Sequence, residues 1–121
     1  MLDHLGLRVS EYAKSKRFYE STLAPLGYEV VMEFGGSMAG LGAAGKPDFW
    51  ISQGEAGGPI HLAFASPDRA TVDAFHQAAL AAGGSDNGAP GLRPEYHPSY
   101  YGAFVLDPDG NNVEAVCHQP E

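Results

Sequence analysis

The stretch His4-Leu5-Gly6-Leu7 recurs 57 residues further along the chain as His61-Leu62-Ala63-Phe64. Three downstream pairs keep the same offset: Phe18 and Phe75, Leu23 and Leu80, Gly27 and Gly84. A repeat of this kind decides the architecture, because each copy folds into the same supersecondary unit. We therefore predict two copies of one unit related by a pseudo-twofold axis, with the two histidines in equivalent positions that could face each other.

Each copy shows a strand pattern, then a helix pattern, then further strands. In the first copy we expect a strand at 2–9, a helix from Ser10 to about Gly27, and strands at 28–34, 37–44 and 48–52. In the second copy we expect a strand at 60–65, a helix that starts at Ser66-Pro67 and stops at Gly83-Gly84, and strands at 100–106 and 112–118. Residues 85–98 contain three prolines and no clear period, so we expect a loop there. The order predicts an α+β fold of two βαβββ modules.

Length, charge and cysteine content narrow the class of protein. A chain of 121 residues most simply forms one domain, 1–121, with module one at 1–53 and module two at 59–118. The net charge of −8, without a run of Lys or Arg, argues against nucleic acid and anionic membranes as partners. We see no signal peptide and no segment long enough to span a bilayer. The single cysteine, Cys117, fits a reducing cytoplasm and most simply a buried strand position.

Three residues could form a metal site. His4 and His61 are repeat-equivalent and lie on the strand face opposite the large apolar residues, and Glu114 lies in the last strand. A lone carboxylate there is costly to bury unless it is paired or bound to a metal. Two imidazoles and one carboxylate suit Fe, Mn, Ni, Co or Zn. The simpler alternatives are structural histidines, and a Glu114 that is exposed or paired with Arg8.

The doubled βαβββ order, the two histidines and the run from Phe104 to Glu114 (FVLDPDGNNVE) resemble the vicinal oxygen chelate superfamily. This is the group of glyoxalase I, bleomycin-resistance proteins and extradiol dioxygenases, and the resemblance covers essentially the whole chain. It implies an open, cupped mixed sheet with the helices on its outer face and the site inside the cup. It also implies a homodimer, in which some members build the site from modules of two chains.

The resemblance assigns His4, His61 and Glu114 as ligands of a divalent metal ion. The metal would act as a Lewis acid on two adjacent oxygens of a small-molecule substrate, or activate dioxygen. One departure concerns a fourth ligand, often Glu, on the last strand of module one. Here that position is Phe49 or Trp50, neither of which can bind a metal. This puts lactoylglutathione lyase activity in doubt and leaves the facial triad of non-haem iron oxygenases.

Further residues are candidates for catalysis or substrate binding. If Asp107 and Asn111 flank a three-residue turn, Phe104 lies opposite Glu114 and Tyr100 shares its face. Tyr100 could then hydrogen-bond substrate or act as an acid, or simply be a packed tyrosine. The others are His97 as a base or outer residue of the site, Arg93 as an anion-binding group and Trp50 as a substrate wall; each could instead be structural or exposed.

Two functions of different classes follow. The leading one is a small metal-dependent lyase, isomerase or dioxygenase acting on a molecule with vicinal oxygens. The alternative is a metal-free binding protein of the bleomycin-resistance type, with stacking surfaces from Trp50, Phe49, Tyr100 and Tyr101. A third possibility is an inactive domain that retains the ligands by descent. The sequence names neither the metal nor the substrate.

Overall fold

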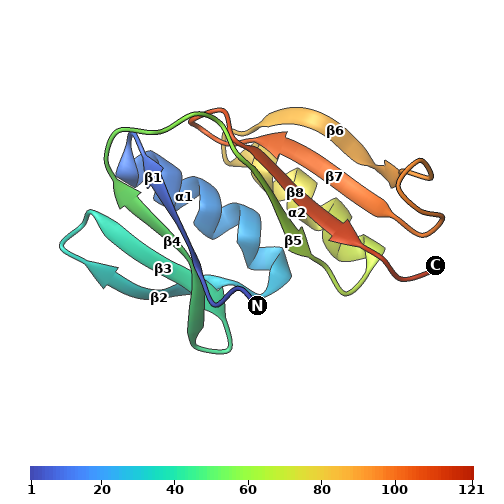
Figure 1. Cartoon of the computed structure of the whole chain (residues 1–121), viewed down its shortest axis with the longest axis horizontal. Helices are drawn as coiled ribbons and strands as arrows, with labels where there is room; N and C mark the ends of the chain where they lie inside the picture. Colours follow the sequence, from blue (N-terminus) through green and yellow to red (C-terminus); the bar gives the residue numbers. More distant parts are fainter.

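The computed structural model describes all residues from 1 to 121 and contains two α-helices, a short 3₁₀ helix and eight strands (Figure 1). The first half comprises β1 (Leu5–Val9), α1 (Tyr12–Leu23), the 3₁₀ helix (Ala24–Leu26), β2 (Glu29–Phe34), β3 (Met38–Ala43) and β4 (Lys46–Gln53). The second half comprises β5 (His61–Ala65), α2 (Arg69–Ala81), β6 (Ser85–Leu92), β7 (Tyr101–Leu106) and β8 (Asn112–Cys117). The predicted α+β fold of two tandem βαβββ modules is confirmed.

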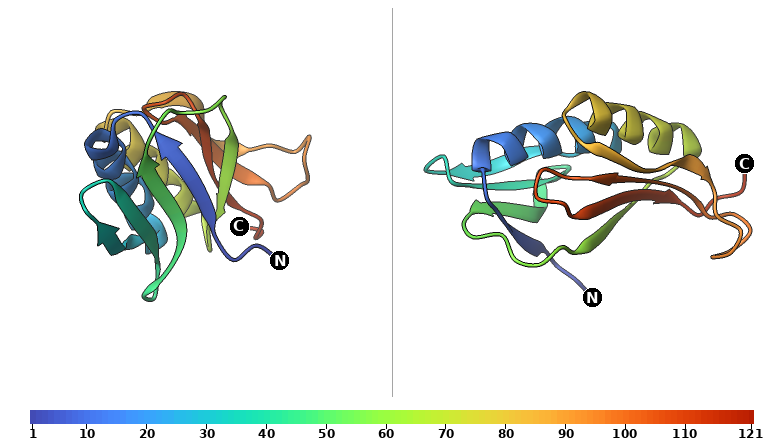
Figure 2. Two further views of the ribbon diagram at one scale, coloured as in Figure 1. Left: turned by 60° about the vertical axis from the view of Figure 1, so that its left-hand side comes forward. Right: turned by 90° about the horizontal axis from the view of Figure 1, so that it is seen from above.

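Each module forms its own four-stranded mixed sheet. The strand order is β1-β4-β3-β2 in module one and β5-β8-β7-β6 in module two. In each sheet the first pair of strands is parallel and the others are antiparallel. Both helices cover the same side of the two sheets and pack against each other (Figure 2). The opposite side of both sheets is therefore open, and β1 and β5 do not pair with each other.

The hydrophobic core lies between the helices and the sheets and is shared by the two modules. Tyr19 of α1 and Phe75 of α2 are fully buried. The ring of Phe64, on β5, lies with its centroid 5.6 Å from Phe49 of β4 and 5.6 Å from Tyr28. Burying a large apolar side chain contributes about 1.5–3 kcal/mol. These aromatic contacts therefore fix the modules as one unit.

The turn between β7 and β8 joins the modules through hydrogen bonds. Asp107 is buried and accepts hydrogen bonds from the Tyr19 hydroxyl, from the backbone N–H groups of Asp109 (2.9 Å) and Asn111 (2.8 Å), and from the Asn111 amide (2.9 Å). Asp109 accepts from the hydroxyl of Ser10 and from its backbone N–H at 3.2 Å. The most specific part of the sequence motif thus holds α1 and the end of β1 against module two.

The structure corrects the prediction of a loop at 85–98, because residues 85–92 form β6. This strand lies at the edge of the sheet and pairs only with β7, with shifts of register between Asp86 and Gly91. Proline is tolerated on an edge strand, where its missing N–H need not pair, and this accommodates Pro90. The glycines and the irregular register remove the alternating pattern by which a strand is recognised. Between β6 and β7, only residues 93–100 lie outside regular structure.

Several element boundaries also differ from expectation. α2 begins at Arg69 and is capped by Asp68, whose carboxylate accepts the backbone N–H of Thr71 at 2.8 Å, rather than by Ser66. β1 begins at Leu5, so the preceding histidine lies just before the strand. Neither α1 nor α2 is long and apolar enough to cross a membrane.

Candidate functional site

The open side of module two carries a buried carboxylate. Glu114 lies in the middle of β8, paired with Ala63 on β5 and Phe104 on β7, and is 1% exposed. The predicted position of Phe104 opposite Glu114 is confirmed. Burial excludes an exposed edge residue, and no ion pair joins Glu114 to Arg8. Because a buried carboxylate is costly without partners, its contacts indicate its role.

Glu114 is held by a histidine and a tyrosine, with no lysine or arginine. Its Oε1 lies 2.8 Å from Nε2 of His61, and its Oε2 accepts a hydrogen bond from the Tyr100 hydroxyl. The His61 side chain is 54% exposed, so it connects the buried carboxylate to solvent. Burial, and then the bond to Glu114, hold the pKa of Tyr100 well above its ordinary value, so the phenol stays protonated as a donor.

Three aromatic rings hold the Tyr100 ring. Tyr96, His97 and His118 lie edge-on to it, with centroids at 4.9, 5.6 and 5.3 Å. The backbone N–H of Ser99 donates to Nδ1 of His97 at 3.0 Å, so a neutral His97 carries its proton on Nε2 and donates it to Nδ1 of His118 at 2.6 Å. His97 therefore contacts the Tyr100 ring and its partner histidine, and not the buried carboxylate.

Arg93 lies on the same side of module two. Its guanidinium carbon is 5.4 Å from the centroid of the Phe104 ring, and its Nη2 donates to the backbone oxygen of Ala89 at 2.8 Å. The Phe104 ring in turn lies 6.2 Å from the His61 ring. The structure thus brings together four predicted site residues of module two. Each neighbours the next, in the order Arg93, Phe104, His61 and Glu114.

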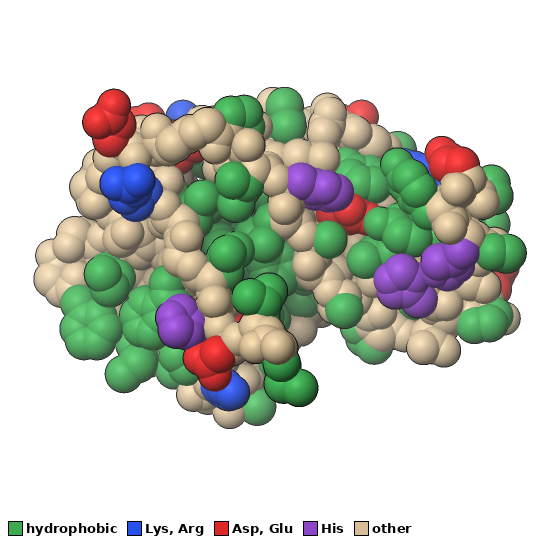
Figure 3. Space-filling view, in the orientation of Figure 1, with side chains coloured by type: hydrophobic (Ala, Val, Ile, Leu, Met, Phe, Trp, Pro, Cys, Tyr) green, Lys and Arg blue, Asp and Glu red, His purple; other side chains and the backbone are tan.

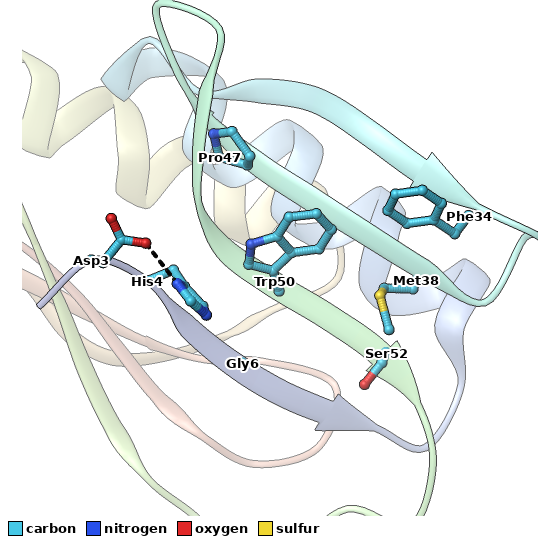
Figure 4. A pocket seen from close by; sticks show the side chains of 8 residues that line it. All are labelled: Asp3, His4, Gly6, Phe34, Met38, Pro47, Trp50 and Ser52. Carbon is cyan, nitrogen blue, oxygen red and sulfur yellow. Dashed lines mark hydrogen bonds and ion pairs between the residues drawn. The ribbon is translucent and has the colours of Figure 1, made fainter.

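The open side of module one carries an aromatic surface (Figure 4). Trp50 of β4 stacks on Phe34 of β2, with centroids 6.2 Å apart and planes at 13°. A Cβ on Gly40 would lie 2.8 Å from the indole, so the ring rests on the backbone of β3. His4 lies beside this surface, with Nδ1 2.8 Å from the Asp3 carboxylate. Trp50, Phe34 and His4 line a cavity of about 580 Å³.

The two open faces carry different chemistry at equivalent positions. Trp50 pairs with Gly6 between β4 and β1, and Glu114 pairs with Ala63 between β8 and β5. Since Gly6 and Ala63 match in the repeat, Trp50 stands where module two has its carboxylate. The other candidate for this position, Phe49, is buried in the core. Module one therefore places an indole, which cannot bind a metal, at the position of the missing fourth ligand.

The three expected metal ligands do not meet within one chain. His61 and Glu114 are in contact, but no three His, Cys, Asp or Glu side chains lie close enough to hold one metal ion. His4 and His61 both line a largely apolar cavity of about 530 Å³ between the modules, within the hollowed region of Figure 3. Protein zinc sites use at least three protein ligands. The imidazole–carboxylate pair fits a divalent metal as two of those ligands, and the third has to come from elsewhere.

Sequence reasoning missed two partners of the predicted residues. Asp3 orients the imidazole of His4, and its position next to His4 in the sequence was an available signal. Phe34 extends the surface of Trp50, but the two residues are distant in sequence and meet only through the register of β2, β3 and β4. The pairing of His118 with His97 depends on the path of the 93–100 loop.

Comparison with known proteins agrees with this architecture. A family model of the glyoxalase/bleomycin resistance protein/dioxygenase superfamily matches residues 1–115. A glyoxalase/bleomycin resistance protein from Albidiferax ferrireducens T118 is 29% identical, with a TM-score of 0.85 over 97% of this chain and 98% of that one. A glyoxalase/bleomycin resistance protein/dioxygenase family enzyme from Burkholderia phytofirmans PsJN is 20% identical, with a TM-score of 0.74 and coverage of 97% and 98%.

A lactoylglutathione lyase from Agrobacterium tumefaciens shares the fold at 18% identity, with a TM-score of 0.70 and coverage of 97% of this chain and 92% of that chain. A search of curated proteins finds no match. The family match spans both modules, including the two histidines, the aspartate-rich turn and Glu114. The chain therefore belongs to the glyoxalase/bleomycin resistance protein/dioxygenase superfamily.

Proposed function

We propose that the protein is a metal-dependent enzyme acting on a small molecule with two adjacent oxygens, as a lyase, isomerase or dioxygenase. The observation that carries this proposal is Glu114: a fully buried carboxylate on an open sheet face, bonded to His61 and Tyr100 and to no lysine or arginine. Such a group is costly for stability and adds nothing to the apolar core. A metal ion would compensate its charge and use the neighbouring imidazole as a second ligand.

The residues around the pair have separate roles in this proposal. His61 and Glu114 hold the divalent metal, which when bound supplies a Lewis acid for adjacent oxygens of the substrate. The Tyr100 hydroxyl orients Glu114 and keeps its own proton, because its pKa is raised. Phe104 and Trp50 offer apolar surfaces for the substrate, while His97 acts through the position of the Tyr100 ring.

The third ligand is His4 from a second copy of the chain. Members of the superfamily bind small molecules and are often dimeric. Within one chain His4 belongs to module one and does not join the His61–Glu114 pair. Both sheets are open on the same side of the molecule, so a twofold partner can bring its module one over module two. The imidazole of His4, held by Asp3, keeps its Nε2 free for such a site.

Metal binding by the untagged protein tests the proposal. We expect Zn²⁺, Ni²⁺ or Fe²⁺ to bind near one per chain in calorimetric titration, and His61→Ala and Glu114→Gln to weaken it by at least about a hundredfold, since each removes a ligand. His76→Gln is the matched control, because it removes a histidine on α2 whose hydrogen-bond partner is Asp86 and not Glu114 or Tyr100. Undiminished binding in both ligand variants would refute the proposed site.

A mixing experiment tests whether the site is shared. His4→Ala and Glu114→Gln chains each lack one ligand at every site, but a mixed dimer has one intact site if the ligands come from two chains. Random exchange of subunits would then restore about a quarter of the sites. No restoration, together with a monomeric protein, would contradict the dimeric site.

A metal-free binding function is the second candidate. The stacked Trp50 and Phe34 surface and its cavity of about 580 Å³ favour it, because they offer a ligand flat apolar contact without a metal. The two candidates differ in one measurement. If Zn²⁺, Ni²⁺ and Fe²⁺ all fail to bind or to raise Tm, the binding function replaces the enzyme.

A further inference from the structure

We propose that the ligand of this site is a carboxylate, held at one end by Arg93. The inference rests on the proposed function for the other end of the molecule, where adjacent oxygens would reach His61 and Glu114. It deepens that function by naming the class of substrate: a small organic acid with an apolar body between its two polar ends.

Arg93 has hydrogen-bonding capacity that the protein does not use. A guanidinium carries five N–H donors, and the one hydrogen bond made by the guanidinium of Arg93 is from Nη2 to the backbone oxygen of Ala89. The chain has 15 acidic and 7 basic residues, yet no acidic side chain forms an ion pair with Arg93. In so acidic a protein, a partly buried arginine without a carboxylate partner is available to bind one from outside.

The guanidinium is also held in place. A Cβ on Gly88 would lie 3.3 Å from Nη2, and a Cβ on Gly91 would lie 3.1 Å from Nη1. Arg93 therefore lies close against the backbone of β6, where the absence of side chains makes room for it. Phe104 borders it on the other side, at 5.4 Å. Because these contacts restrict the side chain before any ligand arrives, binding a carboxylate costs less conformational entropy.

Charge orders the ligand along this face. The Arg93 guanidinium lies against the Phe104 ring, and Phe104 pairs with Glu114 across the two strands. The face thus has a fixed positive group at one end and the Glu114 carboxylate at the other. A ligand carboxylate is attracted to the first and can make the bidentate contact that a guanidinium offers, so the acid group lies at Arg93 and the reacting oxygens at His61 and Glu114.

The dimensions suit a small molecule. The Phe104 ring lies 5.4 Å from the Arg93 guanidinium and 6.2 Å from the His61 ring. The two outer groups therefore cannot be farther apart than the sum of these distances. The Phe104 ring neighbours both groups and offers an apolar surface for the middle of the ligand. A single acid of this length can contact all three residues at once.

Matched pairs of acids and amides test the inference without knowledge of the natural substrate. Binding to the purified full chain is measured by calorimetry for benzoate and benzamide, phenylacetate and phenylacetamide, and 3-phenylpropanoate and its amide. Each pair shares size and shape and differs in charge. The proteins are wild type, Arg93→Met, Arg93→Lys and Arg17→Met. Arg17 is exposed on α1 and makes no ion pair, so its loss gives the same change in net charge away from the site.

We expect at least one acid to bind about tenfold more tightly than its amide, because a charge-assisted bidentate contact is stronger than a neutral one. Arg93→Met should abolish this preference, Arg93→Lys should keep part of it, and Arg17→Met should leave it unchanged. Added NaCl should reduce it in the wild type, a measurement that needs no folded variant. Acids that bind no better than amides, or equal losses in Arg93→Met and Arg17→Met, overturn the inference.

Failure of the inference can be told apart from failure of the proposed function. Arg93→Met leaves His61 and Glu114 in place, so metal binding should be unaffected by it. If the protein binds metal but does not prefer acids, the proposed enzyme function stands and the role of Arg93 as carboxylate anchor is rejected. If the protein prefers acids through Arg93 but binds no metal, the metal site is rejected and the protein is a carboxylate-binding protein.

Discussion

Removing the hydrogen bond between Tyr19 and Asp107 should destabilise the fold more than its single oxygen atom would suggest. The bond joins α1 of module one to the turn of module two, with Tyr19 fully buried and Asp107 5% exposed. Tyr19→Phe deletes the hydroxyl and preserves the ring packing against Phe18 and Phe49. Asp107→Ala deletes the acceptor and leaves the hydroxyl in the core without a partner.

The expected magnitudes follow from burial and charge. A hydrogen bond to a charged group contributes about 1.5–3 kcal/mol, so Tyr19→Phe should lower the free energy of unfolding by that amount. Asp107→Ala should cost about 3–5 kcal/mol, because it also removes the acceptor of three bonds within the turn. In the Asp107→Ala background, Tyr19→Phe should cost almost nothing or stabilise, since it removes an unsatisfied buried donor.

Urea denaturation of the four proteins of this cycle gives the coupling energy directly. Tyr101→Phe is the matched control, because the Tyr101 hydroxyl also bonds an aspartate, Asp73 at 2.7 Å, but at an exposed position. We expect the control to cost less than about 1 kcal/mol. Additive effects of the two core substitutions, or equal costs for Tyr19→Phe and Tyr101→Phe, would refute the role assigned to the turn.

Three further outcomes are expected. Glu114→Gln should change the free energy of unfolding by less than about 1.5 kcal/mol while abolishing metal binding, because the lost bonds offset the cost of a buried charge; a fall of several kcal/mol in urea denaturation would make Glu114 structural. Burial raises the pKa of Tyr19 in the folded state, so above pH 10 the unfolded chain loses this phenol proton before the folded chain does. The free energy of unfolding should therefore fall by about 1.4 kcal/mol per pH unit from this group. Tyr19→Phe should make the dependence of stability on pH less steep. Gly40→Ala should displace the indole that rests on it and shift the fluorescence of Trp50, the one tryptophan, to longer wavelength; an unchanged spectrum would contradict the packing.

Most of the fold could be predicted from the repeat, because the hydrophobic periodicity and the turn residues that define each unit are local properties of the sequence. The second helix and the last hairpin of module two lie close to where they were expected. β6 was missed for a physical reason. An edge strand with proline, glycine and irregular pairing does not require alternating apolar residues, so its sequence shows no strand pattern. Its presence is known only from its pairing with β7.

The candidate site was predictable to a different degree in each module. In module two, alternation along β7 and β8 placed Phe104 and Tyr100 on the face of Glu114, and the structure agrees. In module one the sequence left Phe49 and Trp50 open as the equivalent position. The bulge between Leu41 and Gly42 and the turn length alter the register, and only the pairing with β1 resolves it.

The sequence by itself determined that the chain has two repeated units, that each begins with a histidine followed by a strand and a helix, and that a lone carboxylate lies in the last strand. These follow from periodicity and spacing, which act over a few residues. The tertiary structure decided which groups meet: Glu114 with His61 and Tyr100, Arg93 with Phe104, and His4 apart from them. Such contacts depend on strand register and on how two modules pack through a shared core, and these are properties of the whole chain.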